Sequence, residues 1–598
     1  MAYRRKDLSE VERPNLRSGA NFVGVGRDLF KITSLPMAVS SYILDSIGFN
    51  RLVDTSLKWD PSQCDVSPGD AIRAMVLTMV MSGYRPALEN VHSKFSGQPL
   101  PLYFESVSDY RQLDPDMLAR TLTKLHESDD VKLFMNVSSA LRARLGLKTR
   151  AVHSDTTSVS VEGSYDRYDE QGRALVRDSE GALVYDEDTI VITRGYSKDR
   201  RPDLLQYMIG EAVDENGIPV LSKPLDGNTA DSRWNEQCLD LLKDMLRNER
   251  VAYVADSKVV NDPLVSEMID EGIMFLSRCP ANFNSKVLAQ SLMEFNLDDL
   301  HEIPDLSPKK GAAKRRIVEG CAYFKGTRLR TVLVETSTLA GRGEKAIERQ
   351  RSMIESKIAA FDNVFDCEAD ARNKGGKLLK SLSKSIFDVD YEIEHAVIER
   401  RPKGRPRKDG TDIRRADKWT YHVKYSLNET KAEELRRREG YIMLISNIPS
   451  KEEDPEIGMT AEELVRLYGN EWKVEAAFHC KKRPLLVERL FIKDPARAEA
   501  LITVVNIAAL IRAVIQVMLR KAVNRLSDED LPLCGRSSGP LQRNVTADFF
   551  IDNCSNCYLQ CNLSSHSYAL FGGDDRALIY LELLGIPPEQ LFSGSDRK

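Results

Sequence analysis

Apolar residues recur at helical spacing from Leu35 to about Leu147. The segments LPMAVSSYILDSIGF and DAIRAMVLTMVMSGY are long stretches of this kind, and their spacing predicts helices that bury an apolar face. Asp114 precedes a further helical stretch, DPDMLARTLTKLHESDDVKLFMNVSSALRARLGL, and fits the N-cap position. The pattern predicts an all-α domain over residues 31–148, preceded by a mobile polar tail over residues 1–30.

At Thr149 the period of the pattern changes from helical to two. Alternate residues of the next segment share one face of a predicted strand, namely Ala151, His153, Asp155, Thr157, Val159 and Val161. DLLQYMIGEAVD and GIPVLSKPLDG predict two more strands, joined by a turn at residues 215–217. The helix DSRWNEQCLDLLKDMLRNE, the strand VAYVADS, the helix DPLVSEMIDEG and the strand IMFLSRCP follow. The order β-β-β-α-β-α-β predicts an α/β core of ribonuclease H-like fold, whose first part spans residues 149–300.

Residues 301–440 interrupt this order with short β-like runs and a basic helix-like stretch. YIMLISNI then predicts a returning buried strand, and TAEELVRLYGNEWKVEAAFHCKK predicts a helix that Thr460 and Glu463 begin as a capping box. The stretch AEALITVVNIAALIRAVIQVML is apolar enough for a core helix. We expect a mainly β insertion domain over 301–440, the second part of the core over 441–530, and a C-terminal module over 531–598.

Composition agrees with a soluble globular protein of several domains, since 598 residues are too many for one core and 42% are hydrophobic. No uninterrupted apolar run reaches the roughly 18 residues that span a bilayer, and MAYRRKDLSEVERPN lacks the apolar segment of a secretory signal. Ten scattered cysteines suit free thiols in a reducing compartment. These features predict a cytoplasmic protein with no membrane partner.

The net charge of −5 is unevenly distributed. Residues 301–440 hold 32 Lys and Arg against 23 Asp and Glu, a balance of +9, so the rest of the chain carries −14. Basic charge on one segment is the pattern expected of a protein that binds a polyanion. A solvated, charge-rich insertion is the alternative.

Three carboxylates in different segments are candidates for catalysis. Asp155 lies in the first predicted strand, Asp256 ends the strand of YVADS, and Glu475 lies on the predicted helix of residues 460–482. A two-metal site for phosphodiester chemistry needs clustered hard oxygen ligands that hold two Mg²⁺ ions about 3.5–4 Å apart. The three residues fit such a site.

The helix of Glu475 carries further candidate contacts. On an ideal helix Tyr468, Trp472, Glu475 and Lys482 fall on one face within about 80°. Lys482 lies about 10 Å beyond Glu475 along the axis, where it can touch a phosphate of the same DNA strand. An ordinary amphipathic helix with a solvated Glu and Lys is the alternative.

The spacing Y-x6-E-x6-K resembles the Y-x2-R-x3-E-x6-K signature of bacterial DDE transposases of the insertion-sequence-four type. ITRGYSKDRRPDLLQYMIGEAVDENGIPVLSKPLDGNTADSRWN, YVADSKVVN and the helical front segment resemble one large branch of that group, so the resemblance covers some 500 residues. It implies that Asp155, Asp256 and Glu475 bind the metal ions and that Tyr468 and Lys482 contact DNA. Glu471 replaces the Arg of the signature, and an acid cannot hold a phosphate.

The resemblance also bears on Trp472, because the family often has Trp at this position. Trp472 either stacks on a distorted base near the cleavage site, which would help a hairpin step, or packs in the core.

In the insertion, RPKGRPRKDG resembles an AT-hook, so Arg405 and Arg407 are candidate DNA contacts in a narrow minor groove. A basic solvated loop is the alternative.

Cys554, Cys557, Cys561 and His566 have spacing that could close a zinc site. Because CSNCYLQCN also alternates like a strand, buried thiols over residues 554–562 are favoured. His153, two residues before Asp155, is expected to be a packed or hydrogen-bonded histidine.

The sequence therefore predicts a DNA transposase that cuts and rejoins the ends of an insertion sequence, through hairpin ends as the resemblance implies. Its expected cofactors are two Mg²⁺ ions per site, for which Mn²⁺ can substitute. Its expected partners are the double-stranded terminal inverted repeats, target DNA and a second copy of the chain, in a prokaryotic cytoplasm at the nucleoid. The alternatives are a ribonuclease H-like nuclease without strand transfer and a catalytically idle DNA-binding regulator.

Overall fold

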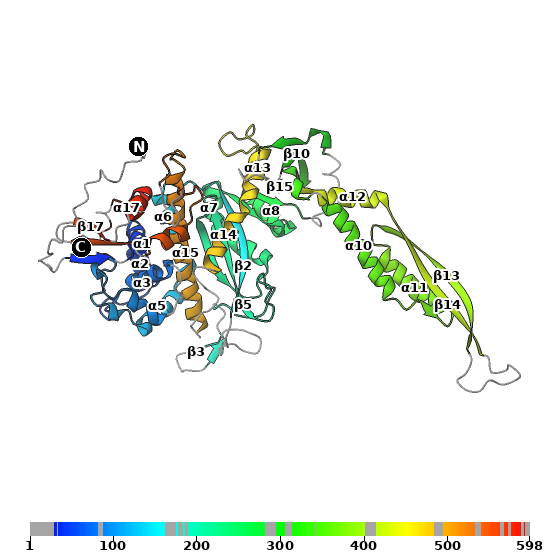
Figure 1. Cartoon of the computed structure of the whole chain (residues 1–598), viewed down its shortest axis with the longest axis horizontal. Coiled ribbons are helices and arrows are strands. Elements are labelled where there is room, and N and C mark those ends of the chain that lie inside the picture. The colour runs from blue at the N-terminus through cyan, green and yellow to red at the C-terminus, as the bar shows by residue number, and fades with distance from the viewer. Residues whose placement is uncertain are drawn as a thin grey trace. The chain divides into compact units, whose positions relative to one another are not determined.

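A computed structural model describes residues 29–591, except for residues 33, 82–87, 162–174, 178–182, 186–188, 281–294, 305–313, 340, 401–413, 483–493, 533–539, 556, 563–566, 572–575 and 588–590. The protein is of mixed α/β class, with a large mixed sheet and many helices (Figure 1). The chain divides into two compact units: the first is Met1–Ser277 with Leu467–Lys598, and the second is Arg278–Arg466. The second unit thus begins before, and ends after, the insertion expected at residues 301–440.

The predicted helical region at the start of the first unit is confirmed. Its helices are α1 (Leu35–Asp45), α2 (Phe49–Ser56), α3 (Pro68–Val80), α4 (Val91–Lys94), α5 (Pro115–His126) and α6 (Asp130–Arg144). Asp114 is the N-cap of α5, as predicted, and its side chain accepts hydrogen bonds from the N–H groups of Asp116 and Met117. The long helix α15 (Pro495–Val523) packs against α3, α5 and α6, so distant parts of the chain share one apolar core.

The predicted core helix is α15. It is long and apolar enough by composition to cross a membrane, although polar residues such as Asn506 and Arg512 interrupt its apolar run. However, 83% of its most apolar window is buried inside the protein. The helix therefore serves as the central core helix of the first unit.

The sheet of the first unit contains the strands expected from the alternating pattern. These are β2 (Ala151–Val161), β5 (Leu205–Asp214), β6 (Pro219–Leu225), β7 (Ala252–Ala255) and β8 (Phe275–Arg278). They lie side by side in the order β6-β5-β2-β7-β8. The β6, β5 and β2 strands are mutually antiparallel, whereas β2, β7 and β8 are parallel. The short strands β3 (Leu175–Arg177) and β4 (Leu183–Tyr185) form a separate pair.

Helices cover both faces of this sheet. α7 (Asp231–Asn248) packs on β2, β5 and β7, and α8 (Asp262–Asp270) connects β7 with β8. The approach of α7 is close because Gly210 has no side chain: a Cβ there would lie 2.4 Å from the ring of Trp234. α14 (Trp472–Lys482) packs on β2 and β5, while α6 and α15 pack on β6. The face of β2 opposite α7 is thus the one that faces α14.

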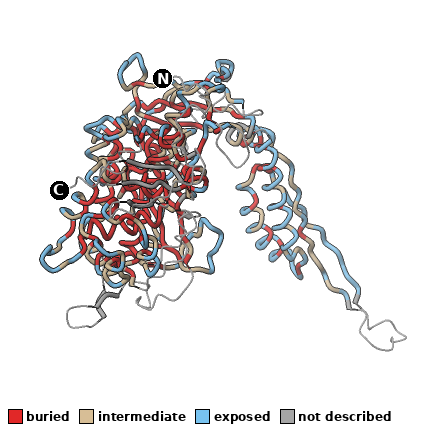
Figure 2. The backbone as a smooth tube through the Cα atoms, turned by 60° about the vertical axis from the view of Figure 1, so that its left-hand side comes forward, coloured by how far each residue is buried: buried red, intermediate tan, exposed pale blue. Residues whose placement is uncertain are grey.

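The second unit contains the antiparallel strands β15 (Tyr441–Ser446), β11 (Thr327–Thr336), β10 (Arg315–Phe324) and β9 (His301–Ile303). A long hairpin of β13 (Phe387–Arg400) and β14 (Arg414–Leu427) pairs with β12 (Val364–Phe365). The insertion, expected to be mainly β, contains helices as well as strands, namely α10 (Arg342–Ala359), α11 (Glu368–Leu382) and α12 (Glu429–Gly440). Figure 2 shows that buried residues dominate the sheet of the first unit, whereas most of the β13–β14 hairpin is exposed.

The C-terminal part of the first unit contains α16 (Ala547–Cys554), β16 (Tyr558–Asn562), β17 (Ser567–Phe571) and α17 (Arg576–Leu584). β16 pairs with β17 and with β1 (Leu29–Ile32). The strand expected over residues 554–562 begins only at Tyr558, because Cys554 is the last residue of α16. Cys554 and Cys557 are buried, whereas the side chain of Cys561 and all of His566 lie outside the described residues.

Candidate active site

Asp155 and Asp256 lie at neighbouring positions on adjacent strands. In the parallel pair of β2 and β7, Ser154 is in register with Ala255. Asp155 is the next residue of β2, and Asp256 directly follows β7 with an extended backbone, φ −65° and ψ 175°. Since adjacent strands lie about 4.8 Å apart, the two carboxylates leave the backbone at adjacent points of the sheet.

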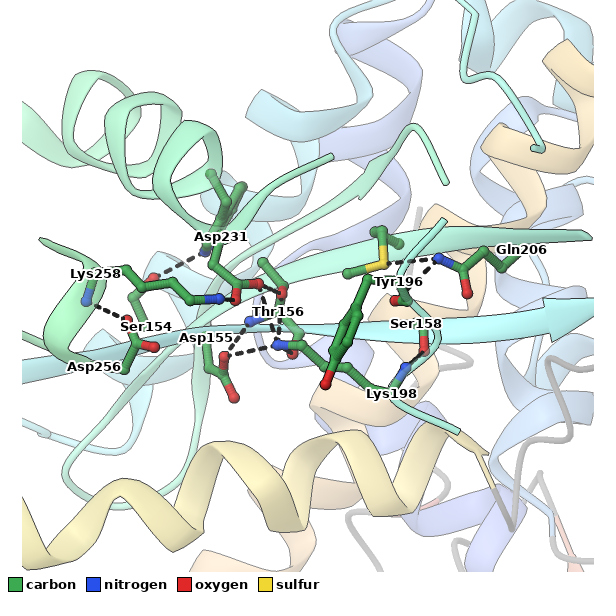
Figure 3. A network of polar contacts seen from close by, with 12 residues as sticks. Ser154, Asp155, Thr156, Ser158, Tyr196, Lys198, Gln206, Asp231, Asp256 and Lys258 are labelled. Atoms are coloured by element: carbon green, nitrogen blue, oxygen red, sulfur yellow. Dashed lines mark hydrogen bonds and ion pairs between the residues drawn. The ribbon is translucent and has the colours of Figure 1, made fainter. Parts of the chain in front are cut away.

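Both carboxylates lie on the face of the sheet that α14 covers. Side chains alternate along β2, and Ser154 accepts a hydrogen bond from Trp234 Nε1 of α7 at 2.9 Å, so Asp155 and His153 occupy the opposite face. Burial and, to a lesser extent, the positive charge of Lys473 on α14 lower the pKa of His153 to about 3. Figure 3 shows Asp155 pointing toward a helix drawn in yellow, whereas the carboxylate of Asp256 accepts a hydrogen bond from the N–H of Lys258 at 3.0 Å. His153 is a buried histidine beside the site, as expected.

Lys198 supplies the positive charge nearest to Asp155. Its Nζ lies 3.3 Å from Asp155 Oδ1 and donates to the main-chain oxygen of Thr156 at 2.8 Å (Figure 3). Burial raises the pKa of Asp155, and the Lys198 ammonium opposes that shift. The Asp155 side chain is still 40% exposed. The Lys198 ammonium therefore lies beside the Asp155 carboxylate, which is exposed enough for a divalent cation to reach as well.

Asp231, the first residue of α7, is an acidic neighbour that the sequence prediction missed. It forms ion pairs with Lys258 and with Lys198, the latter at 3.2 Å, and it accepts a hydrogen bond from the hydroxyl of Thr156. Burial raises the pKa of Asp231, but these hydrogen bonds and charges outweigh burial and leave the pKa lowered. An acid in the first turn of a helix is ordinary in sequence, so only the pairing of Lys198 and Lys258 reveals its position.

Glu475 lies in the first turn of α14 and is exposed. Its neighbours Val474 and Phe478 are buried and turn the helix toward the sheet, which leaves Glu475 at the edge of the buried face. The prediction of one continuous helix from Tyr468 to Lys482 is wrong. α13 (Ala461–Tyr468) ends at Tyr468, and the 3-10 turn η7 (Gly469–Glu471) separates it from α14. A 3-10 turn advances about 120° per residue, so Tyr468 leaves the predicted face.

Lys481 fixes α14 to the sheet. Its Nζ lies 2.9 Å from Glu211 Oε1 and donates to Ser222 Oγ at 2.8 Å. Lys481 is 1% exposed and Glu211 is fully buried. Glu211 on β5 pairs directly with Asp155 on β2, so the side chains of the two residues lie on one face. Lys481 is therefore the buried counter-ion of the strand beside Asp155.

Most of the predicted DNA contacts lie outside the residues that the structure describes. Tyr468 is half-buried at the end of α13. The backbones of Trp472 and Lys482 lie in α14, but their side chains are outside the described residues, as are Arg405 and Arg407 entirely.

The carboxylates offer the hard oxygen ligands that Mg²⁺ prefers. Asp155 and Asp256 are adjacent, and α14 brings the helix of Glu475 to the same face of the sheet. Within the described residues, no group of three or more His, Cys, Asp or Glu side chains lies close enough together to hold one metal ion. The structure thus brings two of the predicted ligands together, and the third lies on a helix that packs on the same strand.

Residues 32–139, the helical region from β1 to α6, match a family described as a domain of unknown function (DUF4277). No curated protein matches the chain.

Proposed function

We propose that the chain is a DNA transposase that cleaves the ends of an insertion sequence and joins them to target DNA. The observation that carries the proposal is the register of β2 with β7, which sets Asp155 beside Asp256. The strand order supports a ribonuclease H-like core as part of this proposal, because β2 is flanked by two antiparallel strands on one side and by the parallel strands β7 and β8 on the other. That strand order is compatible with several classes of ribonuclease H-like enzyme. We choose the transposase class because the spacing of residues on the Glu475 helix resembles the transposase signature.

The residues have separate roles in this proposal. Asp155, Asp256 and Glu475 would hold two Mg²⁺ ions, which would supply activation of water or of a 3′-OH and stabilisation of the leaving 3′ oxygen. Lys198, which pairs with Asp155, would become available to a phosphate if a metal ion took its place at that carboxylate. Lys258 forms an ion pair with Asp231 and helps to keep this carboxylate ionised. Lys481 holds α14, and thus Glu475, over the strand of Asp155.

The partners follow from this chemistry. Double-stranded terminal repeats and target DNA are the substrates, and two copies of the chain bring two ends together. The basic balance of residues 301–440 supports contacts of the second unit with the phosphate backbone. A cytoplasmic location at the nucleoid belongs to the same proposal.

A strand-transfer assay tests the proposal. Purified protein is mixed with Mg²⁺, a labelled duplex that carries the DNA flanking the gene, and a supercoiled target plasmid. Cleavage at the inverted repeats followed by joining to the plasmid is the expected result. Cleavage without joining would indicate a nuclease, and binding without cleavage would indicate a regulator. Either outcome would replace the proposed function.

A further inference from the structure

A cavity of about 300 Å³ lies in the first unit, on the side of α14 away from Glu475. Its lining comes from α14, from α15, from the start of α16 and from the turn after β5. The side chains that matter are Lys473, His479, Arg512, Arg520 and Asp548. Lys473 and Glu475 are two residues apart, so they leave the helix about 160° apart. Neither Asp155 nor Asp256 lines the cavity, which is therefore separate from the candidate active site.

Positive charge dominates this lining. Lys473 Nζ donates to the main-chain oxygen of Glu215, and Arg520 Nε donates to the main-chain oxygen of Val545 at 2.9 Å. Arg512 forms an ion pair with Asp548, whose carboxylate is the acidic group of the lining. The lining of the cavity thus contains three cationic side chains and one carboxylate, and it also includes the exposed side chain of His479.

The cations are partly withdrawn from water, which strengthens their attraction for an anion. Burial lowers the pKa of Lys473, and the charge of Arg520 lowers it further, while Glu215 and Asp214 oppose the shift. Burial also lowers the pKa of Arg520. Arg512 is 1% exposed, and its Nε has no hydrogen-bond partner within the described part of the chain. A buried donor without a partner is costly, so this cavity favours a ligand with several acceptor oxygens.

We propose that this cavity binds a backbone phosphate of DNA, held by Arg520, Lys473 and Arg512. The inference rests on the proposed function, because it adds a second point of contact for the same DNA. A phosphodiester carries the negative charge and the acceptor oxygens that guanidinium and ammonium groups bind best. The helix that separates Lys473 from Glu475 is about 10 Å across, so the bound phosphate is not the scissile one. The cavity positions the DNA strand and does not cleave it.

The first experiment measures the salt dependence of DNA binding. Arg520→Gln removes a cavity cation, and Arg525→Gln removes the same charge from an exposed residue beyond the end of α15. A labelled duplex of arbitrary sequence is titrated in EDTA at several salt concentrations, so that cleavage plays no part. Each lost phosphate contact lowers the slope of log K against log salt by about 0.9. The expected result is that Arg520→Gln loses about this much and Arg525→Gln keeps the wild-type slope. Equal slopes for all three proteins would overturn the inference.

A second measurement identifies the source of the phosphate. Inorganic phosphate is expected to raise the melting temperature of the wild type and of Arg525→Gln more than that of Arg520→Gln. If phosphate protects in this pattern while the duplex slopes are equal, the cavity takes free phosphate and the DNA assignment is wrong. Should Arg520→Gln fail to fold by circular dichroism, Lys473→Gln replaces it in both experiments. A protein that shows these slopes but never cleaves DNA would sink the transposase proposal and leave this inference standing.

Discussion

Two strand pairs of this protein are built in opposite ways. In the first unit, β2 and β5 are paired over ten positions, and most of their residues are buried. Their charged neighbour, the ion pair of Lys481 with Glu211, is excluded from water. In the second unit, β13 and β14 are paired over fourteen positions, and their charges lie on the surface. Cross-strand ion pairs connect Glu392 with Lys424, Glu394 with His422, His395 with Asp417, and Glu399 with Arg415.

The difference teaches which charges have a positional role. A buried ion pair adds little net stability, but loss of one partner leaves a charge in a medium that cannot solvate it. Exposed pairs are screened by water and salt, so each of them contributes little. The long hairpin is held by its backbone ladder and by residues such as Phe387 and Tyr421, which are buried in the small cores of the second unit. Geometry in the first unit therefore depends on single residues, whereas the hairpin does not.

The largest effect is expected from the carboxylates beside β2. Asp155→Asn, Asp256→Asn and Glu475→Gln each remove a carboxylate of the proposed metal site, so we expect end cleavage to fall by on the order of a thousandfold or more. DNA binding in EDTA should change little, because the phosphate contacts lie elsewhere. A variant that still cleaves at a substantial rate in Mg²⁺ would remove that residue from the proposed ligands.

The next effect concerns Lys481. Lys481→Met leaves Glu211 charged and buried, which should cost about 3–5 kcal/mol of unfolding free energy in urea. The double variant Lys481→Met with Glu211→Gln should recover much of that loss. Lys482→Ala is the matched control on the next residue: we expect it to slow end cleavage and weaken end binding at unchanged stability, with partial recovery in Lys482→Arg. If Lys481→Met proved as stable as the wild type, the contrast between buried and exposed pairs would fail.

A smaller effect on stability is expected from Glu499 on α15, and this effect depends on pH. Burial and, to a lesser extent, the charge of nearby Asp130 raise the pKa of Glu499 to about 8, although Glu499 Oε2 accepts a hydrogen bond from the N–H of Ile190 at 3.0 Å. His126 Nδ1 lies 3.9 Å from the same oxygen. Because the folded pKa exceeds the unfolded value, the stability that the protonated group supports is full below about pH 4.5 and is lost as the pH rises toward about 8.

Glu499→Gln keeps an acceptor for Ile190 and removes the titration. The variant should therefore melt at a higher temperature than the wild type at pH 8.5 and at a similar temperature at pH 5. The melting temperatures of both proteins are measured at the two pH values in one buffer series. If the wild type instead melted at a higher temperature than Glu499→Gln at pH 8.5, the surroundings would favour the ionised carboxylate, and this prediction would be wrong.

The smallest effect is expected in the hairpin. Lys424→Ala breaks the pair with Glu392, but both side chains are more than 60% exposed. We expect no change in melting temperature beyond experimental error, at low or high salt. A clear loss of stability at low salt that disappears at high salt would mean that the exposed pairs act as a network.

The sequence predicted the helices and strands of the first unit well, because the spacing of apolar residues there matches the residues that are buried in the structure. The alternation around Asp155 and the strand end at Asp256 follow from local pattern, and the helices before Thr149 follow from their spacing. The break between α13 and α14 could not be seen, since a 3-10 turn at Gly469–Glu471 leaves the apolar spacing nearly intact. A distant partner is equally invisible: Lys481 reads as one of two solvated lysines until β5 supplies Glu211.

The same reason explains the other omissions at the candidate site. Lys198, Asp231 and Lys258 come from three separate segments, and each is an ordinary polar residue in its own segment. The helices of the second unit were also underestimated, because their exposed faces are so rich in charge that little apolar period remains.

The pairing of Lys481 with Glu211 also sets an order of events on the ribosome. Lys481 follows Glu211 by 270 residues, so at roughly 5–20 residues per second the strand emerges well before its counter-ion. During that interval the nascent sheet carries a carboxylate with nothing to neutralise it, and β2 and β5 cannot close under a helix that does not yet exist. Chains released early by a nonsense codon before Glu475 would therefore lack both Glu475 and the cation that neutralises Glu211 on β5. Such fragments are expected to be degraded rather than to accumulate beside the full-length protein.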